Sequence, residues 1–412
     1  MVAEELAISL AEEYVTPGQM MADPFCGSGR LLAAACDLPG ERVGFDVNPL
    51  ACLLSKAKFA ATSADAIHRI LGEVPEPGRR ERHAPLIELP AHRKVEWFSG
   101  GALRELSEIV AWLNSISLDA EERLVVAAAL SAVTREVSFA RKMGWKLHRM
   151  SAAEREAPRN ADAWTLLMRR LAYCALALER SPPLMCNAAI VRGDCTNPAV
   201  VEPYKGRCDV VLTSPPYGDS KSTVQYGATS ELCLNVVRNL DGFGDYAMRG
   251  GAIERGCLGG DPRESQDERL QMFWAGKRGS REASSAARFL AALSRACASV
   301  DHLLKPGGTA VFIVARRSTG GFRLKIDEFL LDEMSSLGLE MERLRHRTLK
   351  WKRAPHFVNR FARSASLEKR AAGVLPTMKD EVILTFKKPL PATNARPVEQ
   401  MPGIATLVSQ HG

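Results

Sequence analysis

A glycine-rich turn between a short apolar strand and a helix is the feature that most constrains the fold of this chain. Residues 20–22 are apolar, and they lead directly into Asp23-Pro24-Phe25-Cys26-Gly27-Ser28-Gly29. The residues that follow predict a helix over 30–36, a strand over 41–45 that ends in Asp46, and a helix over 49–61. Strand, glycine-rich turn, helix, strand and acid in this order are typical of a nucleotide-binding α/β unit.

The alternation of apolar strands and helices resumes near residue 188. Predicted strands cover 189–191, 208–212, 309–315 and 381–386, and predicted helices cover 4–15, 286–304 and 325–336. These elements are sufficient for an α/β fold with one doubly wound, Rossmann-like sheet. Two regions interrupt it: a helix-rich insertion at 62–187 and a Gly-rich, polar excursion at 219–284 that we expect to be irregular. We expect 389–412 to form a loose C-terminal tail.

Composition narrows the class of protein. The 412 residues are 46% hydrophobic and 25% charged, which excludes a largely disordered chain. No apolar run reaches the roughly 18 residues of a membrane span, and the N-terminus carries acids where a signal peptide carries positive charge. We therefore expect a cytoplasmic protein that is not bound to a membrane.

The 10 cysteines include no C-x-x-C pair and no zinc-finger spacing to histidine, so we expect reduced thiols and no structural metal.

The glycine-rich turn has the chemistry of a nucleoside site. Gly27 and Gly29 allow the backbone to approach a ligand closely, and an acid such as Asp46 at the end of the second strand can accept hydrogen bonds from ribose hydroxyls. The third residue after Gly29 is Leu32, so the G-x-G-x-x-G fingerprint of a dinucleotide site is absent. The alternative for this turn alone is a tight strand-to-helix connection that binds no ligand.

A second motif, Thr213-Ser214-Pro215-Pro216-Tyr217, follows the predicted strand 208–212. It should lie at the carboxyl edge of the sheet, where open α/β folds bind ligands. The prolines hold the segment extended and leave carbonyls that only accept hydrogen bonds. A hydroxyl and a carbonyl that accept both hydrogens of an exocyclic amino group would steer its nitrogen toward tetrahedral geometry, while Tyr217 stacks on the base. The alternative is a stiff surface loop or a polyproline ligand.

Basic residues concentrate between 343 and 370, although the net charge of the chain is only +7. Aromatic residues are interleaved with them, a combination that suits a polyanion such as a nucleic acid. The alternative is a solvated helix face. The candidate phosphate-binding residues are Arg345, Arg347, Lys350, Lys352 and Arg353.

Together the two motifs resemble those of the amino-directed DNA methyltransferases that use S-adenosylmethionine, and the TSPPY form is similar to their cytosine-N(4) branch. The resemblance implies that Ser214, Pro215, Pro216 and Tyr217 are catalytic. It implies that the cofactor is bound by Asp23, Pro24, Phe25, Gly27, Gly29, Asp46, Asn48 and Asp194. In one departure, Arg30 occupies a position where many relatives have Thr.

The resemblance also assigns roles to the segments of the chain. Residues 1–61 would be the cofactor-binding first part of the methyltransferase domain, 188–388 its catalytic second part, and 62–187 a target-recognition insertion. The implied partner is double-stranded DNA, with a cognate restriction endonuclease as a further candidate, in a restriction–modification or orphan methylation system of the bacterial nucleoid. Three alternatives stay open: adenine-N(6) methylation of DNA, methylation of an RNA or tRNA amino group, and an inactive DNA-binding relic. The oligomeric state and recognition sequence are not indicated.

Overall fold

The computed structural model describes residues 2–80, 84–90, 97–141, 147–156, 162–181, 184–217, 226–258, 270, 273, 281–315, 317–319, 322–348, 357–359, 374–376 and 380–391.

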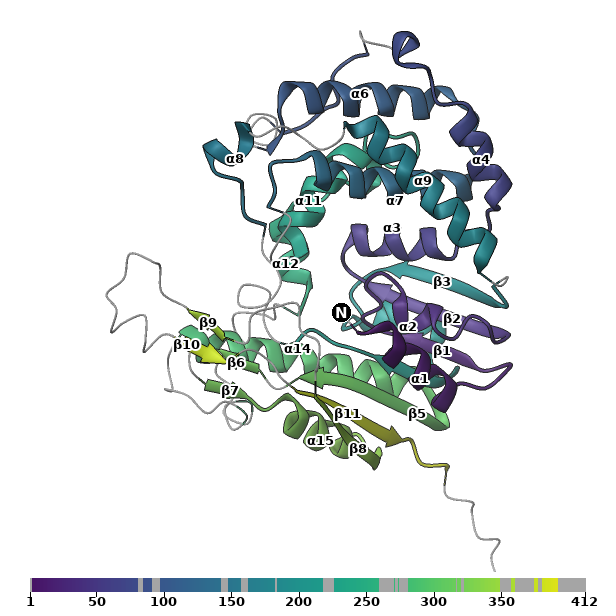
Figure 1. The fold of residues 1–412 in the computed structure, drawn as a ribbon. Helices are drawn as coiled ribbons and strands as arrows, with labels where there is room; N and C mark the ends of the chain where they lie inside the picture. The colour runs from purple at the N-terminus through teal and green to yellow at the C-terminus, as the bar shows by residue number, and fades with distance from the viewer. Residues whose placement is uncertain are drawn as a thin grey trace, which may run out of the picture.

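Seven strands form the central sheet, in the order β3-β2-β1-β4-β5-β11-β8 (Figure 1). The strands are β1 (Met20–Asp23), β2 (Gly40–Asp46), β3 (Cys186–Arg192), β4 (Cys208–Thr213), β5 (Leu304–Ala315), β8 (Glu340–Thr348) and β11 (Asp380–Lys387). Neighbours from β3 to β5 are parallel, and β11 is antiparallel to both β5 and β8. Numbered along the chain, the seven strands therefore lie in the order 3-2-1-4-5-7-6. The predicted α/β fold with a doubly wound sheet is confirmed.

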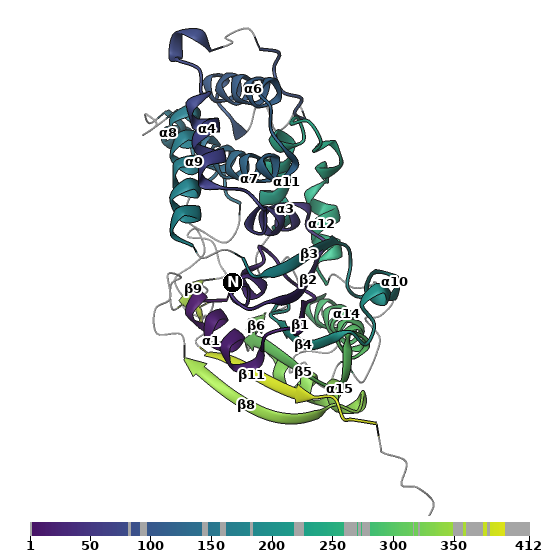
Figure 2. The same ribbon diagram turned by 90° about the vertical axis from the view of Figure 1, so that its right-hand side faces the viewer.

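Helices cover both faces of this sheet (Figure 2). α1 (Glu4–Tyr14) and α2 (Arg30–Ala33) lie on one face, and α14 (Arg281–Leu303) and α15 (Ile326–Ser336) lie on the other. Alternate residues of β1 serve the two faces, because Met21 packs with α1 and α2 while Met20 and Ala22 pack with α14 and α15. Successive side chains point to opposite faces, and helices cover both faces, so nearly every residue of the strand is apolar.

A helical body lies beyond the β3 edge of the sheet (Figure 1). Its core is shared by α3 (Pro49–Lys58), α4 (Ala64–Gly72), α6 (Gly100–Ser115), α7 (Ala120–Val137), α9 (Ala163–Arg180) and α11 (Tyr226–Val237). Five of these helices begin at a side chain that accepts a backbone N–H of the first turn, which fixes where each starts: Asn48, Ser63, Ser99, Asp119 and Asp162. The helix-rich character expected of 62–187 is confirmed.

Several shorter elements connect the main helices and strands. They are the helices α8 (Ala152–Glu156), α10 (Pro198–Val201) and α12 (Gly250–Gly256), and the 3₁₀ turns η1 (Pro77–Arg79), η2 (Glu202–Tyr204) and η3 (Gly244–Tyr246). Two small antiparallel pairs lie outside the main sheet: β6 (Arg317–Thr319) with β7 (Phe322–Leu324), and β9 (Phe357–Asn359) with β10 (Val374–Pro376).

The irregular structure expected over 219–284 is wrong for the part of it that the structure describes continuously, 226–258. That part contains α11 and α12, and α11 packs into the core of the helical body. Glycines suggested loops there, but Gly227 and Gly250 serve a different purpose. A Cβ on Gly227 would collide with the carbonyl of Gly250, so these glycines let two helices approach closely.

The expectation that all cysteines are reduced is also wrong. Cys36 and Cys186 form a disulfide with Cα atoms 5.1 Å apart, and the other eight cysteines are free. The chain separates this pair by 150 residues. The fold brings them together because the residues after α2 and the start of β3 meet at the amino edge of the sheet, where the Met185 N–H donates to the Cys36 carbonyl (2.8 Å).

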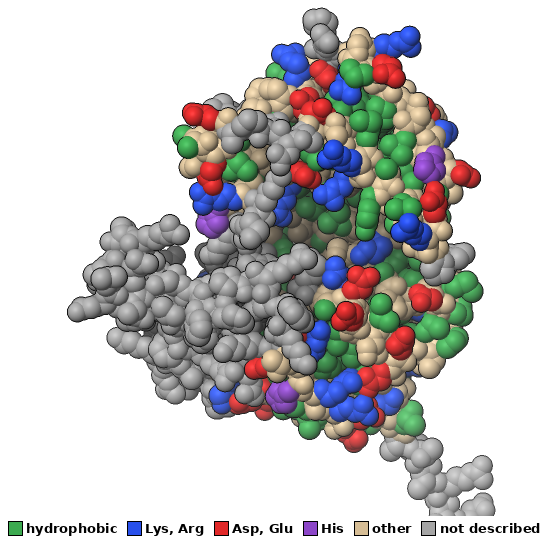
Figure 3. Space-filling view, in the orientation of Figure 1, with side chains coloured by type: hydrophobic (Ala, Val, Ile, Leu, Met, Phe, Trp, Pro, Cys, Tyr) green, Lys and Arg blue, Asp and Glu red, His purple; other side chains and the backbone are tan. Residues whose placement is uncertain are grey.

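The visible face carries mixed charge, and the described helices include no membrane span. On the face in Figure 3, the visible Lys and Arg side chains are interspersed with Asp and Glu. No helix among the described residues is long and apolar enough to span a bilayer. Within the same residues, no three His, Cys, Asp or Glu side chains are grouped so that they could hold a metal ion.

Candidate functional site

The two motifs meet in a buried hydrogen bond at the carboxyl edge of the sheet. Asp23 ends β1 and Thr213 ends β4, and these strands are neighbours, with Ala22 opposite Val211. The Thr213 Oγ1 donates to the Asp23 Oδ1 at 2.6 Å, and both residues are buried. Two residues 190 positions apart in the sequence are therefore parts of one site.

Asp23 also shapes the glycine-rich turn. Its Oδ1 accepts a second hydrogen bond, from the Phe25 N–H at 3.0 Å. Burial, reinforced by nearby Asp46, raises the pKa of Asp23 from 3.8 to about 7, although the two hydrogen bonds lower it. Near neutral pH this carboxyl group is therefore divided between its charged and neutral forms.

The two glycines of the turn have different roles. Both have a positive φ, +52° at Gly27 and +72° at Gly29. A Cβ on Gly29 would collide with the Ser55 hydroxyl of α3, so Gly29 allows α3 to pack against the turn. A Cβ on Gly27 would meet nothing within 4 Å. Gly27 therefore faces the space where a ligand can approach the backbone.

Asp46 is held by two backbone donors. Its Oδ2 accepts from the Gly27 N–H (3.0 Å) and its Oδ1 from the Asn48 N–H (2.8 Å). Burial raises the pKa of Asp46 to about 6, and the two hydrogen bonds oppose that rise. An ionised carboxylate has about four acceptor positions, so after these two bonds it can still accept from two hydroxyl groups.

Asn48 is buried and its side chain is occupied with the fold. Its Oδ1 accepts from the Leu50 N–H at the start of α3, and its Nδ2 donates to the Ser230 Oγ of α11 at 2.9 Å. Asn48 therefore has a structural role, since it ties the turn after β2 to α11, and its cofactor contact stays a prediction.

Asp194 follows β3 and comes directly after Gly193, which lines a cavity of about 460 Å³. Its Oδ1 accepts from the N–H and hydroxyl of Thr196 (2.9 and 2.8 Å). The neighbouring Gly193 N–H donates to the Asp46 carbonyl (3.0 Å), which joins the turns after β2 and β3. The cavity is lined by Val47, Pro49, Arg192, Gly193, Asp245, Ala247, Met248, Ala252 and Gly256.

Sequence reasoning missed the cavity wall formed by 245–256. These residues belong to the excursion and carry no motif, and only the fold places them opposite Val47 and Gly193. Arg192 holds this wall of the cavity against β3, because its Nη1 donates to the Asp245 carbonyl (2.9 Å). A cavity of this size is within the range of small-molecule sites.

Ser214 and Tyr217 lie together in the second motif. The Ser214 Oγ and the Tyr217 hydroxyl are 3.2 Å apart, and Pro215 between them is buried. Tyr217 and Phe25 both pack against the same hydrophobic core cluster. Burial raises the pKa of Tyr217, and the carboxylate of Glu381 at the start of β11 raises it further. Tyr217 therefore stays protonated, and Ser214 has a hydroxyl partner beside it.

Two of the five predicted DNA-binding residues are described, and both are ion-paired. Arg345 donates to Glu13 (2.7 Å) and to the Tyr14 hydroxyl (3.1 Å), and Arg347 donates to Glu381 (3.3 Å). Both arginines lie on β8, an edge strand that sequence reasoning missed. Lys350, Lys352 and Arg353 lie outside the described residues. The segment that contains them leaves β8 at Thr348 and returns at Asp380, which are paired at the carboxyl edge of the sheet.

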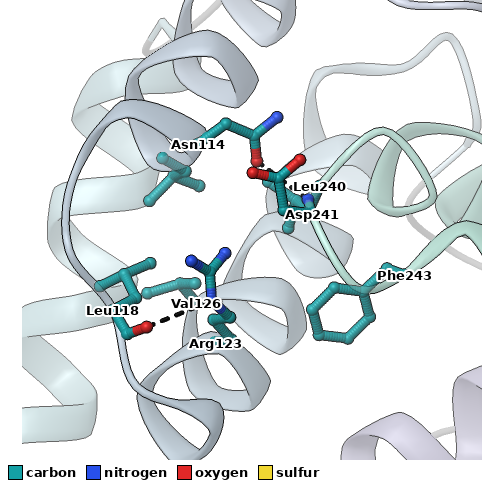
Figure 4. A pocket seen from close by; sticks show the side chains of 8 residues that line it. Asn114, Leu118, Arg123, Val126, Leu240, Asp241 and Phe243 are labelled. Atoms are coloured by element: carbon teal, nitrogen blue, oxygen red, sulfur yellow. Dashed lines mark hydrogen bonds between the residues drawn. The ribbon is translucent and has the colours of Figure 1, made fainter.

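A second hollow, in the helical body, is too narrow for a ligand. It is lined by residues of α6, α7 and the turn after α11, and it contains about 0 Å³ of space for a water-sized molecule (Figure 4). The Asn114 side chain accepts from the Asp241 N–H (3.0 Å) and Arg123 donates to the Leu118 carbonyl (3.2 Å) across it. This hollow is a packing feature and not a ligand site.

Comparison with known proteins gives one relative by sequence. Over 343 residues the chain is 25% identical to the type II methyltransferase M.MvaI of Kocuria varians, covering 76% of this chain and 73% of that protein. No protein-family model matches the chain.

Two solved structures illustrate the structural similarity. An S-adenosylmethionine-dependent methyltransferase from Methanosarcina mazei matches 93% of this chain and 98% of its own, with 8% identity and a TM-score of 0.34. An arsenic(III) S-adenosylmethionine methyltransferase from Chlamydomonas reinhardtii matches 95% of this chain and 75% of its own, with 10% identity and a TM-score of 0.31. Scores this low say nothing about the substrate. By its strand order and its similarity to M.MvaI, the chain has the Rossmann-like fold of the S-adenosylmethionine-dependent methyltransferases.

Proposed function

We propose that the protein is a DNA methyltransferase that transfers the methyl group of S-adenosylmethionine to the exocyclic N(4) amino group of cytosine. The observation that carries the proposal is the hydrogen bond between Thr213 and Asp23. It places the turn that offers a nucleoside site next to the motif that offers acceptors for an amino group. Methyl transfer requires donor and acceptor to be held together in this way.

The cofactor is S-adenosylmethionine, and the residues at the carboxyl edge fit it. Gly27 leaves open space for its approach, and Asp46 retains acceptor positions for its ribose hydroxyls. The Asp194 Oδ2, which accepts none of the Thr196 hydrogen bonds, can accept from its adenine amino group. The cavity beside Val47 and Gly193 supplies an apolar wall for the adenine ring. When bound, the cofactor supplies an electrophilic methyl group on a sulfonium centre.

The second motif would hold the methyl acceptor. The Ser214 hydroxyl and the Pro215 carbonyl would accept the two hydrogens of the amino group, and the Tyr217 ring would stack on the base. This arrangement activates the nitrogen by position and electrostatics and needs no covalent bond between enzyme and base. The cysteine nearest the turn is unsuited to such a bond, since burial raises the pKa of Cys26 well above its usual value.

The choice of cytosine over adenine rests on the letters of the motif. Ser214 stands where adenine-N(6) enzymes more often carry Asp, and that likeness to the cytosine-N(4) branch is the support for this part of the proposal. Similarity to the type II methyltransferase M.MvaI supports the enzyme class and is silent on the base.

The DNA part of the proposal requires the target base to leave the helix. A base inside a duplex cannot reach the cofactor, so flipping it out costs a few kcal/mol. Lys350, Lys352 and Arg353 are in the segment that starts and ends at the carboxyl edge, which suits phosphate contacts beside the site.

Methyl transfer in vitro tests the proposal. Purified protein would be incubated with methyl-labelled S-adenosylmethionine and, in separate reactions, unmethylated duplex DNA, bulk tRNA and ribosomal RNA. We expect label in DNA alone, and none with the Ser214→Ala, Tyr217→Ala double variant. Label in RNA would contradict the assigned substrate. If the protein bound both the cofactor and DNA but transferred no methyl group to DNA from several sources, it would be an inactive relic.

A further inference from the structure

Two cations flank the glycine-rich turn, and in the described part of the chain neither forms an ion pair with a carboxylate. Lys58, the last residue of α3, donates from Nζ to the Ser28 carbonyl (2.8 Å), and Arg30, the first residue of α2, donates from Nη1 to the Val2 carbonyl (2.8 Å). Both of these partners are neutral backbone carbonyls. Among the described residues, neither cation has a carboxylate within ion-pair distance.

These two charges act on each other. The Lys58 side chain as a whole is exposed, yet its ammonium end is surrounded closely enough by protein atoms for burial to lower its pKa. The nearby Arg30 guanidinium lowers that pKa further, and Glu4 only partly opposes the effect. Two like charges held close together are relieved when an anion lies between them. Arg30 and Lys58 together therefore favour the binding of an anion.

The order of the strands indicates which part of a bound nucleoside would lie near Arg30 and Lys58. Asp194 follows β3, Asp46 ends β2, the glycine-rich turn follows β1 and Ser214 follows β4, and these strands lie side by side in that order. A nucleoside whose base lies by Asp194 and whose ribose lies by Asp46 extends its 5′ substituent toward the turn after β1. Arg30 and Lys58 are cations at that turn.

We propose that Arg30, assisted by Lys58, binds the α-carboxylate at the amino-acid end of the cofactor. This inference rests on the proposed function, because it assumes the nucleoside end to be bound by Asp46 and Asp194. Arg30 has five N–H donors, of which one is used on Val2, so it can offer a carboxylate two parallel hydrogen bonds. The position at which this chain departs from the proteins it resembles would then serve the same ligand through a charge.

Calorimetric titration with two ligands tests the proposal. S-adenosylhomocysteine has the carboxylate, and 5′-methylthioadenosine has the same nucleoside and sulfur but no amino-acid end. We expect Arg30→Gln to weaken S-adenosylhomocysteine binding about 10- to 100-fold, the usual range for a charge-assisted hydrogen bond, and methylthioadenosine binding less than about 2-fold. Lys58→Gln should show the same selectivity with a smaller loss.

Two further variants control for folding and charge. Arg30→Lys keeps the charge without the planar fork, so its loss for S-adenosylhomocysteine should be smaller than that of Arg30→Gln. Lys205→Gln removes an exposed cation that is paired with Glu202 just before β4, at the amino edge of the sheet, and should change neither affinity. Equal weakening of both ligands by Arg30→Gln, or unchanged S-adenosylhomocysteine binding, would overturn the inference. If the unaltered protein bound neither ligand, the proposed cofactor site itself would be wrong.

Discussion

The Thr213 hydroxyl donates a 2.6 Å hydrogen bond to the Asp23 carboxyl, and this single contact joins the turn after β1 to the motif after β4. Both residues are buried, so water does not compete for the bond. A change at either residue should therefore affect the stability of the fold and the alignment of the two halves of the site together.

Replacing Thr213 with Val should destabilise the protein by about 2 kcal/mol. Valine has the same shape but cannot donate, so the buried Asp23 loses one of its two donors. Urea unfolding at pH 8 measures the change. Thr134→Val is the matched control, because Thr134 is equally buried but donates only to the Leu130 carbonyl of its own helix. A loss no larger than that of the control would contradict the importance of the bond between the motifs.

The stability of the protein should fall as the pH rises from 4 to 7. The folded state holds the proton of Asp23 up to a pKa of about 7, whereas the unfolded chain releases it near 3.8. The contribution is thus full below pH 3.8 and is lost by about pH 7, for a total of up to about 4 kcal/mol. Asp46, with a folded pKa of about 6, acts in the same direction.

Asp23→Asn isolates the share that belongs to Asp23. Asparagine can still accept from Thr213 through its Oδ1 but does not titrate. Urea unfolding at pH 5 and pH 8 should give a smaller difference for this variant than for the unaltered protein. An equal difference in the two proteins would show that Asp23 does not retain its proton on folding.

Thiol counting should find eight free cysteines in the denatured, unreduced protein and ten after reduction, because Cys36 and Cys186 are joined. Reduction should also lower the free energy of unfolding by about 3–5 kcal/mol, since the disulfide closes a long loop in the unfolded chain. Cys36→Ser should be as stable as the reduced protein and insensitive to reductant. Ten free thiols before reduction would contradict the pairing.

DNA binding should depend on the segment after β8 and not on β8 itself. Arg345→Ala removes a charge already neutralised by Glu13 and should leave affinity and its salt dependence nearly unchanged. A combined Lys350, Lys352 and Arg353 to Ala variant should weaken binding and reduce the slope of log K against log salt by about 2–3, at about 0.9 per lost phosphate contact. Fluorescence anisotropy with a labelled duplex at several salt concentrations measures both. The reverse pattern would place the phosphate contacts on β8.

The predictable parts of this protein are those whose chemistry is local in the sequence. The strand, turn and helix around Gly27 and Gly29 occupy fewer than twenty residues, and each step of the pattern has its own physical reason. β8 escaped detection because Glu340–Thr348 carries charges on both faces and shows no alternation of apolar residues. Its Arg343 and Arg345 are paired with Glu13 of α1, more than 300 residues earlier, which no local pattern can indicate.

The same limit applies to the site. Asp46 was predictable as an acceptor at a strand end, but its two backbone partners and its raised pKa depend on burial that only the fold creates. The cavity wall at Met248 and Ala252 and the influence of Glu381 on Tyr217 likewise come from contacts between distant segments. Residue type indicated the chemistry, and tertiary packing determined which residues take part.

The most direct test of the proposed activity is the identity of the methylated base. The protein would be expressed in a host that lacks DNA methylation, and its DNA would be digested to nucleosides and analysed by mass spectrometry. We expect N(4)-methylcytosine, absent when Ser214→Ala and Tyr217→Ala are introduced together. N(6)-methyladenine in its place would contradict the assignment of cytosine. If the host contains abundant protein with an unaltered active site and its DNA still has no methylated nucleosides, the proposed function is contradicted.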